Sequence, residues 1–310
     1  MIKKCKGCGV VLQSDNINKI GYTPNINNKI CQRCFKIKNY GEVIDSKKEF
    51  DNESIIKKIN NDKKFVIFLV DFLNIYSDII DLYKSIKTNK ILVVTKSDLI
   101  PKNIRKNVLI ERIKKVYNIN EDIILTSSKT KENISQIRNI LINNKETIIV
   151  GFTSSGKSSL INALTGSDLT ISKNSNTTQD FIKINTDDFI IYDTPGFINS
   201  NYLESLTPKN IIKPITYQLK NIYCLKLLNM NITSNIDNSF TFYISNEVSI
   251  DKRRIKEEFS ESINVDNNID LIIKGLGFIN IKKESVIKFD FNKELIEIRP
   301  SIVGDNNEQD

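Results

Sequence analysis

The sequence lacks any apolar run long enough to cross a membrane. Its longer apolar runs, such as "FVIFLV" at residues 65–70, have the size of a β-strand, whereas a membrane-spanning helix needs roughly 20 consecutive apolar residues. The first residues, "MIKKCKGCG", also show no apolar signal region and no basic amphipathic leader. We therefore expect a cytoplasmic protein that has no membrane partner and is a monomer.

Cysteine is scarce, and its placement argues against a disulfide framework. Four of the five cysteines form two CxxC pairs near the N-terminus, Cys5 with Cys8 and Cys31 with Cys34. Two such pairs supply the four thiolates of a tetrahedral structural zinc site. We expect these four residues to bind Zn²⁺ in a reducing compartment, and we expect Cys224 to be a small buried residue.

The excess of basic over acidic residues is concentrated near the N-terminus. The net charge is +8, but residues 1–45 carry +5 while residues 206–310 carry −1. Basic side chains surround the N-terminal cysteines: Lys3, Lys4, Lys6, Arg33, Lys36 and Lys38. This distribution favours contact between the zinc ribbon and RNA phosphates, and a purely structural ribbon is the alternative.

The 310 residues exceed what one hydrophobic core usually supports, so two or three units are expected. No internal repeat is present. From residue 65 to about 195, apolar strand-sized runs alternate with amphipathic segments, which predicts a mostly parallel sheet covered on both faces. After Pro208 and Pro214 come "SFTFYIS" at 239–245, the charged "DKRRIKEEF" at 251–259 and "KGLGFINI" at 274–281. We predict a zinc-ribbon domain at 1–45, an α/β domain at 46–205 and a C-terminal α+β domain at 206–310.

The segment "GFTSSGKSS" fits a phosphate-binding loop. It follows the apolar run "TIIV" and precedes a segment with helical character, which is the strand, loop and helix order that such a loop requires. Backbone N–H groups and the helix N-terminus bind phosphate oxygens, Lys157 reaches the outer phosphates and Ser158 ligates Mg²⁺. The candidate residues are Gly151, Thr153, Ser154, Ser155, Gly156, Lys157, Ser158 and Ser159; a Gly/Ser-rich turn is the alternative.

Further along the chain, "YDTPGF" at 192–197 ends a strand with Asp193. This carboxylate is placed to hold Mg²⁺ through water, and the N–H of Gly196 is placed to meet a γ-phosphate. Between these two motifs lies "NTTQD", in which Thr178, or alternatively Thr177, closes over Mg²⁺.

Two motifs that suit guanine precede the phosphate loop. "VVTKSDL" at 93–99 contains Thr95, Lys96 and Asp98 in a [NT]KxD arrangement. The Asp98 carboxylate can accept from N1–H and from the 2-amino group of guanine, while the Lys96 stem covers the base. "LTSSK" at 125–129 follows another strand and offers backbone near Ser127, Ser128 and Lys129 to the base oxygen.

These five motifs resemble the G motifs of translation-factor-type GTPases in a rotated order: G4, G5, G1, G2, G3. That order is typical of circularly permuted GTPases, and rotation is tolerable because domain termini usually lie close together at the surface. With the two leading CxxC pairs, "SFTFYISN" and "KGLGFINI", the sequence resembles the YqeH family of bacterial ribosome-assembly GTPases over almost its whole length.

The resemblance implies GTP hydrolysis with Mg²⁺, linked to maturation of the small (30S) ribosomal subunit. It implies rRNA and ribosomal or assembly proteins as partners, with the C-terminal domain as an RNA- or protein-binding regulatory module. The local "KRRIK" at 252–256 is the candidate RNA contact in that domain. A nucleotide-gated RNA-binding factor with negligible turnover is the alternative, and a P-loop ATPase is a third possibility.

Three residues depart from the usual pattern. Thr95 replaces an Asn whose amide braces the guanine loop, so we expect weaker guanine selectivity. Ser154 replaces an Asn associated with potassium, which leaves K⁺ dependence open. Phe197 stands where a Ras-like enzyme has a water-orienting Gln, so we expect slow intrinsic turnover, with the pre-ribosome or a monovalent cation completing the active site.

Because Gly196 lies shortly before the C-terminal domain, we also expect the nucleotide state to move that domain.

Overall fold

The computed structural model describes residues 3, 11–15, 21–31, 52–166, 170–171, 181–198, 202–203, 208, 210–256 and 258–303. The chain divides into two compact units, Met1–Glu49 and Phe50–Asp310. In the described parts of the first unit, Leu12 and Cys31 are buried and Ile30 packs against them. The remaining cysteines of the predicted zinc site, Cys5, Cys8 and Cys34, lie outside the described residues. The same is true of Lys4, Lys6, Arg33, Lys36 and Lys38.

The second unit begins with a seven-stranded sheet in the order β3-β2-β1-β4-β7-β6-β5. The strands are β1 (Phe65–Asp71), β2 (Lys90–Thr95), β3 (Ile123–Leu125), β4 (Glu146–Gly151), β5 (Thr170–Ile171), β6 (Ile182–Asn185) and β7 (Ile190–Asp193). Strands β3, β2, β1, β4 and β7 pair in parallel, and β6 and β5 are antiparallel. The predicted mostly parallel sheet is therefore confirmed.

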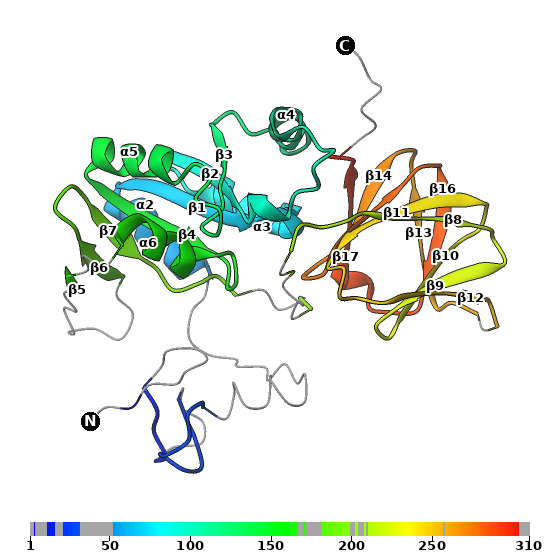
Figure 1. Ribbon diagram of the computed structural model, residues 1–310, viewed down its shortest axis with the longest axis horizontal. Helices are drawn as coiled ribbons and strands as arrows, with labels where there is room; N and C mark the ends of the chain where they lie inside the picture. Colours follow the sequence, from blue (N-terminus) through cyan, green and yellow to red (C-terminus); the bar gives the residue numbers. More distant parts are fainter. Residues whose placement is uncertain are drawn as a thin grey trace. The chain divides into compact units, whose positions relative to one another are not determined.

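The helices cover both faces of this sheet (Figure 1). They are α2 (Asn52–Asp62), α3 (Ser77–Ser85), α4 (Lys106–Tyr117), α5 (Ile134–Asn144) and α6 (Lys157–Thr165), with the short 3₁₀ helices η1 (Phe72–Asn74) and η2 (Ser97–Leu99). Strand β1 shows why both faces are needed, because its residues are apolar on both sides. Phe68 packs in the cluster that includes α2, α3 and α4, and Leu69 packs in the cluster that includes α5 and α6.

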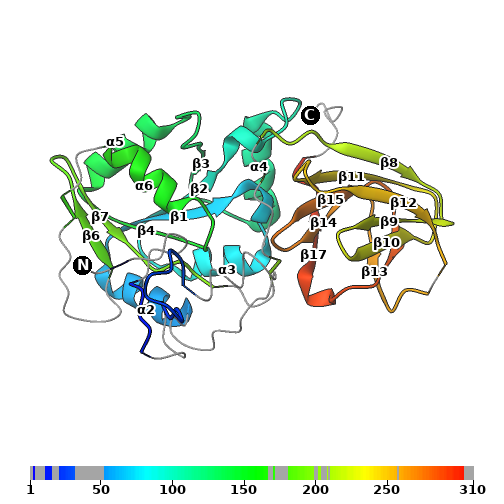
Figure 2. The same cartoon turned by 60° about the horizontal axis from the view of Figure 1, so that its bottom comes forward.

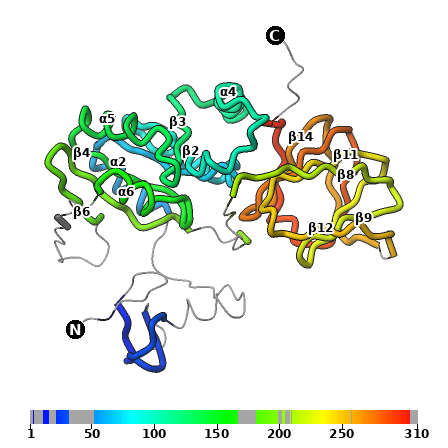
Figure 3. The backbone as a smooth tube through the Cα atoms, viewed as in Figure 1, coloured from blue at the N-terminus to red at the C-terminus, as the bar shows by residue number. Residues whose placement is uncertain are grey.

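The chain enters this sheet at its centre. Strand β1, the first in sequence, lies between β2 and β4. It pairs with β4 although β2, β3 and the α-helices α3, α4 and α5 lie between them in sequence, and the blue-to-cyan and green parts of the tube accordingly lie together in Figure 3. The parallel strands β1, β2, β3, β4 and β7 all direct their carboxyl ends to one edge. Every nucleotide motif that lies in the described residues follows one of these strands, so the topology brings these motifs to the same edge of the sheet.

Residues 215–300 form two antiparallel five-stranded sheets, here called the sandwich (Figure 2). The strands are β8 (Ile215–Leu219), β9 (Tyr223–Leu227), β10 (Met230–Ser234), β11 (Asn238–Ile244), β12 (Ile250–Arg254), β13 (Glu261–Val265), β14 (Ile269–Ile273), β15 (Gly277–Ile281), β16 (Ser285–Phe289) and β17 (Ile296–Pro300), with η3 (Lys293–Leu295) before the last. Apolar side chains from both sheets share one core, as in other sandwiches. Cys224 is buried, as expected.

The predicted α+β character of this C-terminal part is wrong. Residues 210–256 and 258–303 contain strands and one 3₁₀ helix but no α-helix. Part of the charged segment at 251–259 belongs to β12, an edge strand on which Asp251 to Arg254 are all exposed. Charge on an edge strand protects its unpaired backbone groups from other chains. In the sequence, the same run of charged residues hides the alternation of polar and apolar residues that marks a strand.

No helix of the described residues is long and apolar enough to cross a membrane.

Candidate functional site

The phosphate loop, residues 151–158, connects the end of β4 to the start of α6. A Cβ on Gly151 would lie 2.7 Å from the Leu69 carbonyl oxygen and 2.7 Å from Ser155 Oγ, so only glycine fits there. Gly156 has a φ of +87° and precedes the first residue of α6, a conformation that glycine adopts without strain. The loop therefore directs backbone N–H groups and the N-terminus of α6 to the same place, which suits phosphate oxygens.

Lys157 and Asp193 lie together. Asp193 ends β7, next to β4, and its carboxylate accepts a hydrogen bond from Lys157 Nζ. The same ammonium donates to the Thr194 carbonyl oxygen at 2.6 Å. Both side chains are largely shielded from solvent, with 13% and 20% exposure. The structure thus joins the predicted phosphate lysine to the predicted magnesium carboxylate.

The segment after Asp193 lies along the phosphate loop. Phe197 N donates to the Gly151 carbonyl oxygen at 3.0 Å, and Thr153 N donates to the Phe197 carbonyl oxygen at 3.2 Å. A Cβ on Gly196 would lie 3.1 Å from Thr153 Oγ1, so the approach is close. The Phe197 ring is fully buried and packs against Phe68 and Phe152 at centroid distances of 5.8 and 5.4 Å. Phe197 is thus a core residue.

Thr95 links the strand that carries the guanine motif to the phosphate loop. Its hydroxyl, buried at the end of β2, donates to the Ser155 carbonyl oxygen at 2.6 Å. The sequence argument expected the replacement of Asn by Thr to remove an amide that braces the guanine loop and to weaken guanine selectivity, and this expectation stays a prediction. The shorter hydroxyl reaches the phosphate loop because β2 and β4 flank β1 closely on either side.

The two predicted base loops also meet. Asp98, in η2, accepts a hydrogen bond from Ser127 Oγ at 2.7 Å. Ser127 is buried, and its oxygen also accepts from the N–H groups of Lys129 and Thr130, both at 3.2 Å. Ser128 is half-buried and Lys129 is exposed. Residues 95–99 and residues 127–129 are therefore fixed to each other through Asp98.

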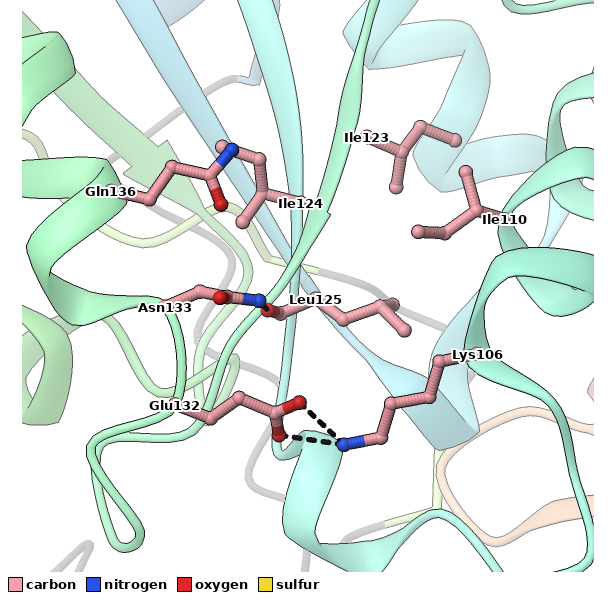
Figure 4. A pocket seen from close by; sticks show the side chains of 8 residues that line it. All are labelled: Lys106, Ile110, Ile123, Ile124, Leu125, Glu132, Asn133 and Gln136. Carbon is pink, nitrogen blue, oxygen red and sulfur yellow. Dashed lines mark hydrogen bonds and ion pairs between the residues drawn. The ribbon is translucent and has the colours of Figure 1, made fainter.

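Two acidic residues at this edge were not found by sequence reasoning. Glu132 accepts hydrogen bonds from Ser97 Oγ at 2.6 Å and from Lys106 Nζ at 2.5 and 2.7 Å. Figure 4 shows the Glu132–Lys106 pair at one end of a pocket of about 320 Å³ beside β3. Burial raises the pKa of the Glu132 carboxyl, but the hydrogen bonds from Lys106 and Ser97 and the Lys106 charge outweigh it, so the pKa lies below its ordinary value.

The second is Asp71, which ends β1 and is 6% exposed in its side chain. Its Oδ2 lies 3.4 Å from Lys96 Nζ. A signal for Asp71 was present in the sequence, because this carboxylate directly follows the strand "FVIFLV" and parallel strands end at one edge. Nothing in "SSKTKEN" distinguishes Glu132 from a solvated glutamate.

The other predicted residues are placed as follows. Thr153, Ser154, Ser158 and Ser159 are exposed at the phosphate loop or the first turn of α6. Thr177 and Thr178 lie outside the described residues, as do three of the four cysteines. Among the residues that the structure describes, no three Cys, His, Asp or Glu side chains form a group that holds a metal ion, so the zinc site stays a prediction.

The phosphate loop suits the phosphates of a nucleotide. Within the described residues, Ser155 Oγ is buried with no hydrogen-bond partner, and this hydroxyl lies 2.7 Å from where a Cβ on Gly151 would stand, so that only glycine leaves room beside it. Lys157 supplies a cation at the same place. Burying an unpaired hydroxyl is costly, which fits a loop that gains partners from a ligand.

This chain is similar to known proteins and protein families. Residues 43–203 match the family described as RsgA GTPase, and residues 146–273 match the family described as 50S ribosome-binding GTPase. "Uncharacterized protein YqeH" of Bacillus subtilis (strain 168) is 29% identical over 337 residues, covering 89% of this chain and 92% of that protein. The crystal structure of YjeQ from Thermotoga maritima is 24% identical, with a TM-score of 0.34, over 45% of this chain and 51% of that chain.

The RsgA GTPase match spans just over half of the chain and contains the phosphate loop, the residue 193–196 motif and both loops that precede them. The second match begins at β4, so that β1, β2 and β3 precede it in sequence yet belong to the same sheet. The chain belongs to the RsgA GTPase family, and it is a P-loop GTPase whose G motifs stand in circularly permuted order.

Proposed function

We propose that this GTPase binds guanine through Asp98, binds phosphates through residues 151–159, and acts in maturation of the small ribosomal subunit. The observation that carries the proposal is the pair of contacts at the sheet edge. Ser127 Oγ fixes Asp98 at 2.7 Å, and Lys157 meets the carboxylate of Asp193. The Thr95 hydroxyl, which donates to the Ser155 carbonyl oxygen at 2.6 Å, joins the motifs before the phosphate loop to the loop itself, as one nucleotide site requires.

Each residue has a distinct role in this proposal. Asp98 accepts from the guanine N1–H and 2-amino groups, the Lys96 stem covers the base, and backbone near Ser128 and Lys129 faces the base oxygen. Lys157 neutralises phosphate charge. Ser158 and Thr178, or alternatively Thr177, would be the protein ligands for Mg²⁺, Asp193 would hold it through water, and the ion would supply further neutralisation of the phosphate charge. The Gly196 N–H donates to the γ-phosphate.

Slow intrinsic turnover is part of the proposal. The buried Phe197 ring cannot orient a water molecule, and its carbonyl and N–H groups are already bonded to the phosphate loop. The pre-ribosome or a monovalent cation then completes the site. Ser154, exposed on the loop with a φ of +67°, leaves the choice between the two open.

RNA contacts are proposed at both ends of the chain. Cys5, Cys8, Cys31 and Cys34 bind Zn²⁺ in a ribbon whose basic flanks meet rRNA phosphates. On the sandwich, Lys252, Arg253, Arg254 and Lys256 are exposed along and just after the edge strand β12. A row of exposed cations on an edge suits a phosphate backbone.

The nucleotide state has a covalent route to the sandwich. Leu203, seven positions after Gly196, donates its N–H to the Lys274 carbonyl oxygen at 3.0 Å, in the turn between β14 and β15. Movement of residues 193–196 around a γ-phosphate is therefore transmitted to the sandwich by a short chain segment. The alternative function, an RNA-binding factor gated by nucleotide with negligible turnover, uses the same route.

The test is co-sedimentation of the full chain with purified 30S subunits, with a non-hydrolysable GTP analogue or with GDP. We expect association that differs at least about tenfold in affinity between the two states, because the states must differ in binding free energy for a switch to operate. The Lys157→Ala variant should lose the difference, and Lys57→Ala, an exposed lysine on α2, should keep it. No association, or equal association in both states, would exclude the switching role. GTP hydrolysis measured in the presence of 30S subunits distinguishes the two functions: hydrolysis supports the enzyme, and negligible hydrolysis supports the RNA-binding factor.

A further inference from the structure

The connection between β1 and α3, residues 71–77, contacts the guanine motif at its start and the sandwich along the rest of its length. It is short, largely buried and contains η1. None of the nucleotide motifs includes it. Its contacts nevertheless form a continuous chain from Lys96 to the sandwich.

Asp71 is the first member of that chain. Its carboxylate accepts from Leu73 N at 3.0 Å and from Asn74 Nδ2 at 3.0 and 2.9 Å, and it faces Lys96 Nζ at 3.4 Å. Two donors, Leu73 N and Asn74 Nδ2, therefore hold the carboxylate in one orientation through three hydrogen bonds. A lysine side chain loses rotamer entropy when it is fixed, and a fixed anion beside Lys96 reduces the entropy that remains to be lost when a base binds.

Asn74 is the second member, and it reaches the sandwich. While its amide nitrogen binds Asp71, its Oδ1 accepts from Gly275 N at 2.9 Å. Gly275 lies in the turn between β14 and β15 and has a φ of +90°. A Cβ there would lie 2.0 Å from the Leu203 carbonyl oxygen. This position of the turn therefore requires glycine, and its N–H is bound by Asn74.

The rest of the connection is bound as firmly. The Ile75 carbonyl oxygen accepts from Tyr117 Oη at 2.9 Å and from Arg299 of the sandwich. Phe72 packs edge to face on Phe278, with ring centroids 5.9 Å apart. These residues belong to the same apolar cluster as β1, so the sandwich shares a core with the GTPase sheet.

The guanine motif has a second, direct attachment to the C-terminal part. The Leu99 carbonyl oxygen, at the end of η2, accepts from Ile212 N at 3.0 Å, and Ile212 is buried in the shared cluster. Residues 95–99 are thus held at Lys96 by the Asp71 chain and at Leu99 by the segment that leads into β8.

We propose that Asp71 and Asn74 are positioning residues for guanine recognition, and that through them the docked sandwich sets the affinity for guanine nucleotides. The proposal rests on the assignment of Lys96 and Asp98 to the base. Lys96 occupies the left-handed region with a φ of 58°, a conformation that non-glycine residues adopt at a cost. The contacts at Asp71 and Leu99 hold Lys96 in that conformation. Weakening the contacts between the sandwich and residues 71–77 should therefore make the base-binding residues less well ordered.

Reciprocity gives the proposal a second consequence. If docking of the sandwich strengthens nucleotide binding, nucleotide binding must strengthen docking by the same factor. A partner that separates the sandwich from residues 71–77 would therefore promote nucleotide release, by a route that does not involve residues 193–196.

The first test is a double-mutant cycle read by the Kd of a fluorescent GDP analogue with the full chain. Asp71→Asn keeps the shape of the side chain and removes its charge. We expect it to weaken GDP binding about tenfold, which corresponds to about 1.4 kcal/mol. In a Lys96→Met background the same change should alter the Kd less than about twofold, because the group on which Asp71 acts is gone.

The matched control is Asp290→Asn. This is the same carboxylate-to-amide change within the sandwich, where Asp290 accepts from Asn231 N at 2.7 Å and from Asn231 Nδ2 at 2.6 Å, and neither residue is among the partners of residues 71–77 described above. Its Kd for GDP should stay within about twofold of wild type. An equal loss in the control, or the same loss with and without Lys96, would reduce Asp71 to a purely structural role and overturn the proposal.

The second test needs no variant. GDP binding to the wild type should slow amide hydrogen exchange in the peptide that contains Gly275, whose N–H is bound to Asn74, and leave the β9–β10 turn around Leu228 unchanged. Unchanged exchange at Gly275 in a protein that binds GDP contradicts the proposal alone. A wild type that binds no GDP would instead contradict the assignment of the guanine site.

Discussion

The hydroxyl of Thr95 joins the guanine motif to the phosphate loop. It donates at 2.6 Å to the Ser155 carbonyl oxygen, and the hydrogen bond is buried. Thr95→Val keeps the shape and removes the donor, which leaves a buried carbonyl unpaired. We expect the free energy of unfolding to fall by about 1–2 kcal/mol and GDP binding to weaken, as measured by urea titration and by fluorescence.

Thr147 is a matched control for this substitution. It is fully buried in β4 of the same sheet, but its hydroxyl has no hydrogen-bond partner among the described residues. Thr147→Val should therefore leave stability unchanged or raise it, since removing an unpaired buried hydroxyl is favourable. Equal losses in the two variants would show that the Thr95 hydrogen bond has no special role.

Between β7 and the sandwich, residues 194–198 run against the phosphate loop and anchor through the Phe197 ring. Phe197→Gln places an amide where a Ras-like enzyme has one, but the position is in the core between Phe68 and Phe152. We expect this variant to lose about 3 kcal/mol of stability and to hydrolyse GTP no faster than wild type, measured by phosphate release. Phe197→Leu should retain most of the stability, and faster hydrolysis by the Gln variant would show that position 197 faces the nucleotide.

For single helices, strands and loops, the sequence predicts the structure well where the pattern involves only neighbouring residues. A glycine loop between a strand and a helix requires only neighbours in sequence, and residues 151–158 have the structure that their pattern predicts. Asp71 could have been found from its place directly after a strand, but Glu132 acts on residues 35 and 26 positions away, so no local pattern reports it. The error over the C-terminal fold has the same origin, because the charges of β12 reflect its place at a sheet edge, which the sequence does not state.

In the whole molecule, the rotated order of motifs has a physical basis in the sheet. Strand β1 enters at the centre, so the guanine motifs lie on one side of it and the phosphate loop and Asp193 on the other. The same central strand leads into the connection that binds the sandwich. The order of the chain therefore places the base loops, the phosphate loop and the C-terminal sandwich around one strand end.

The central claim is that Asp98, more than fifty residues before the phosphate loop, binds the base of the nucleotide held by Lys157. The most direct measurement compares GTP and XTP binding to the wild type and to Asp98→Asn, whose amide suits xanthine and can still accept from Ser127. We predict that Asp98→Asn lowers GTP affinity about 100-fold, or about 2.7 kcal/mol, and binds XTP more tightly than GTP. An Asp98→Asn protein that still prefers GTP over XTP would contradict the account.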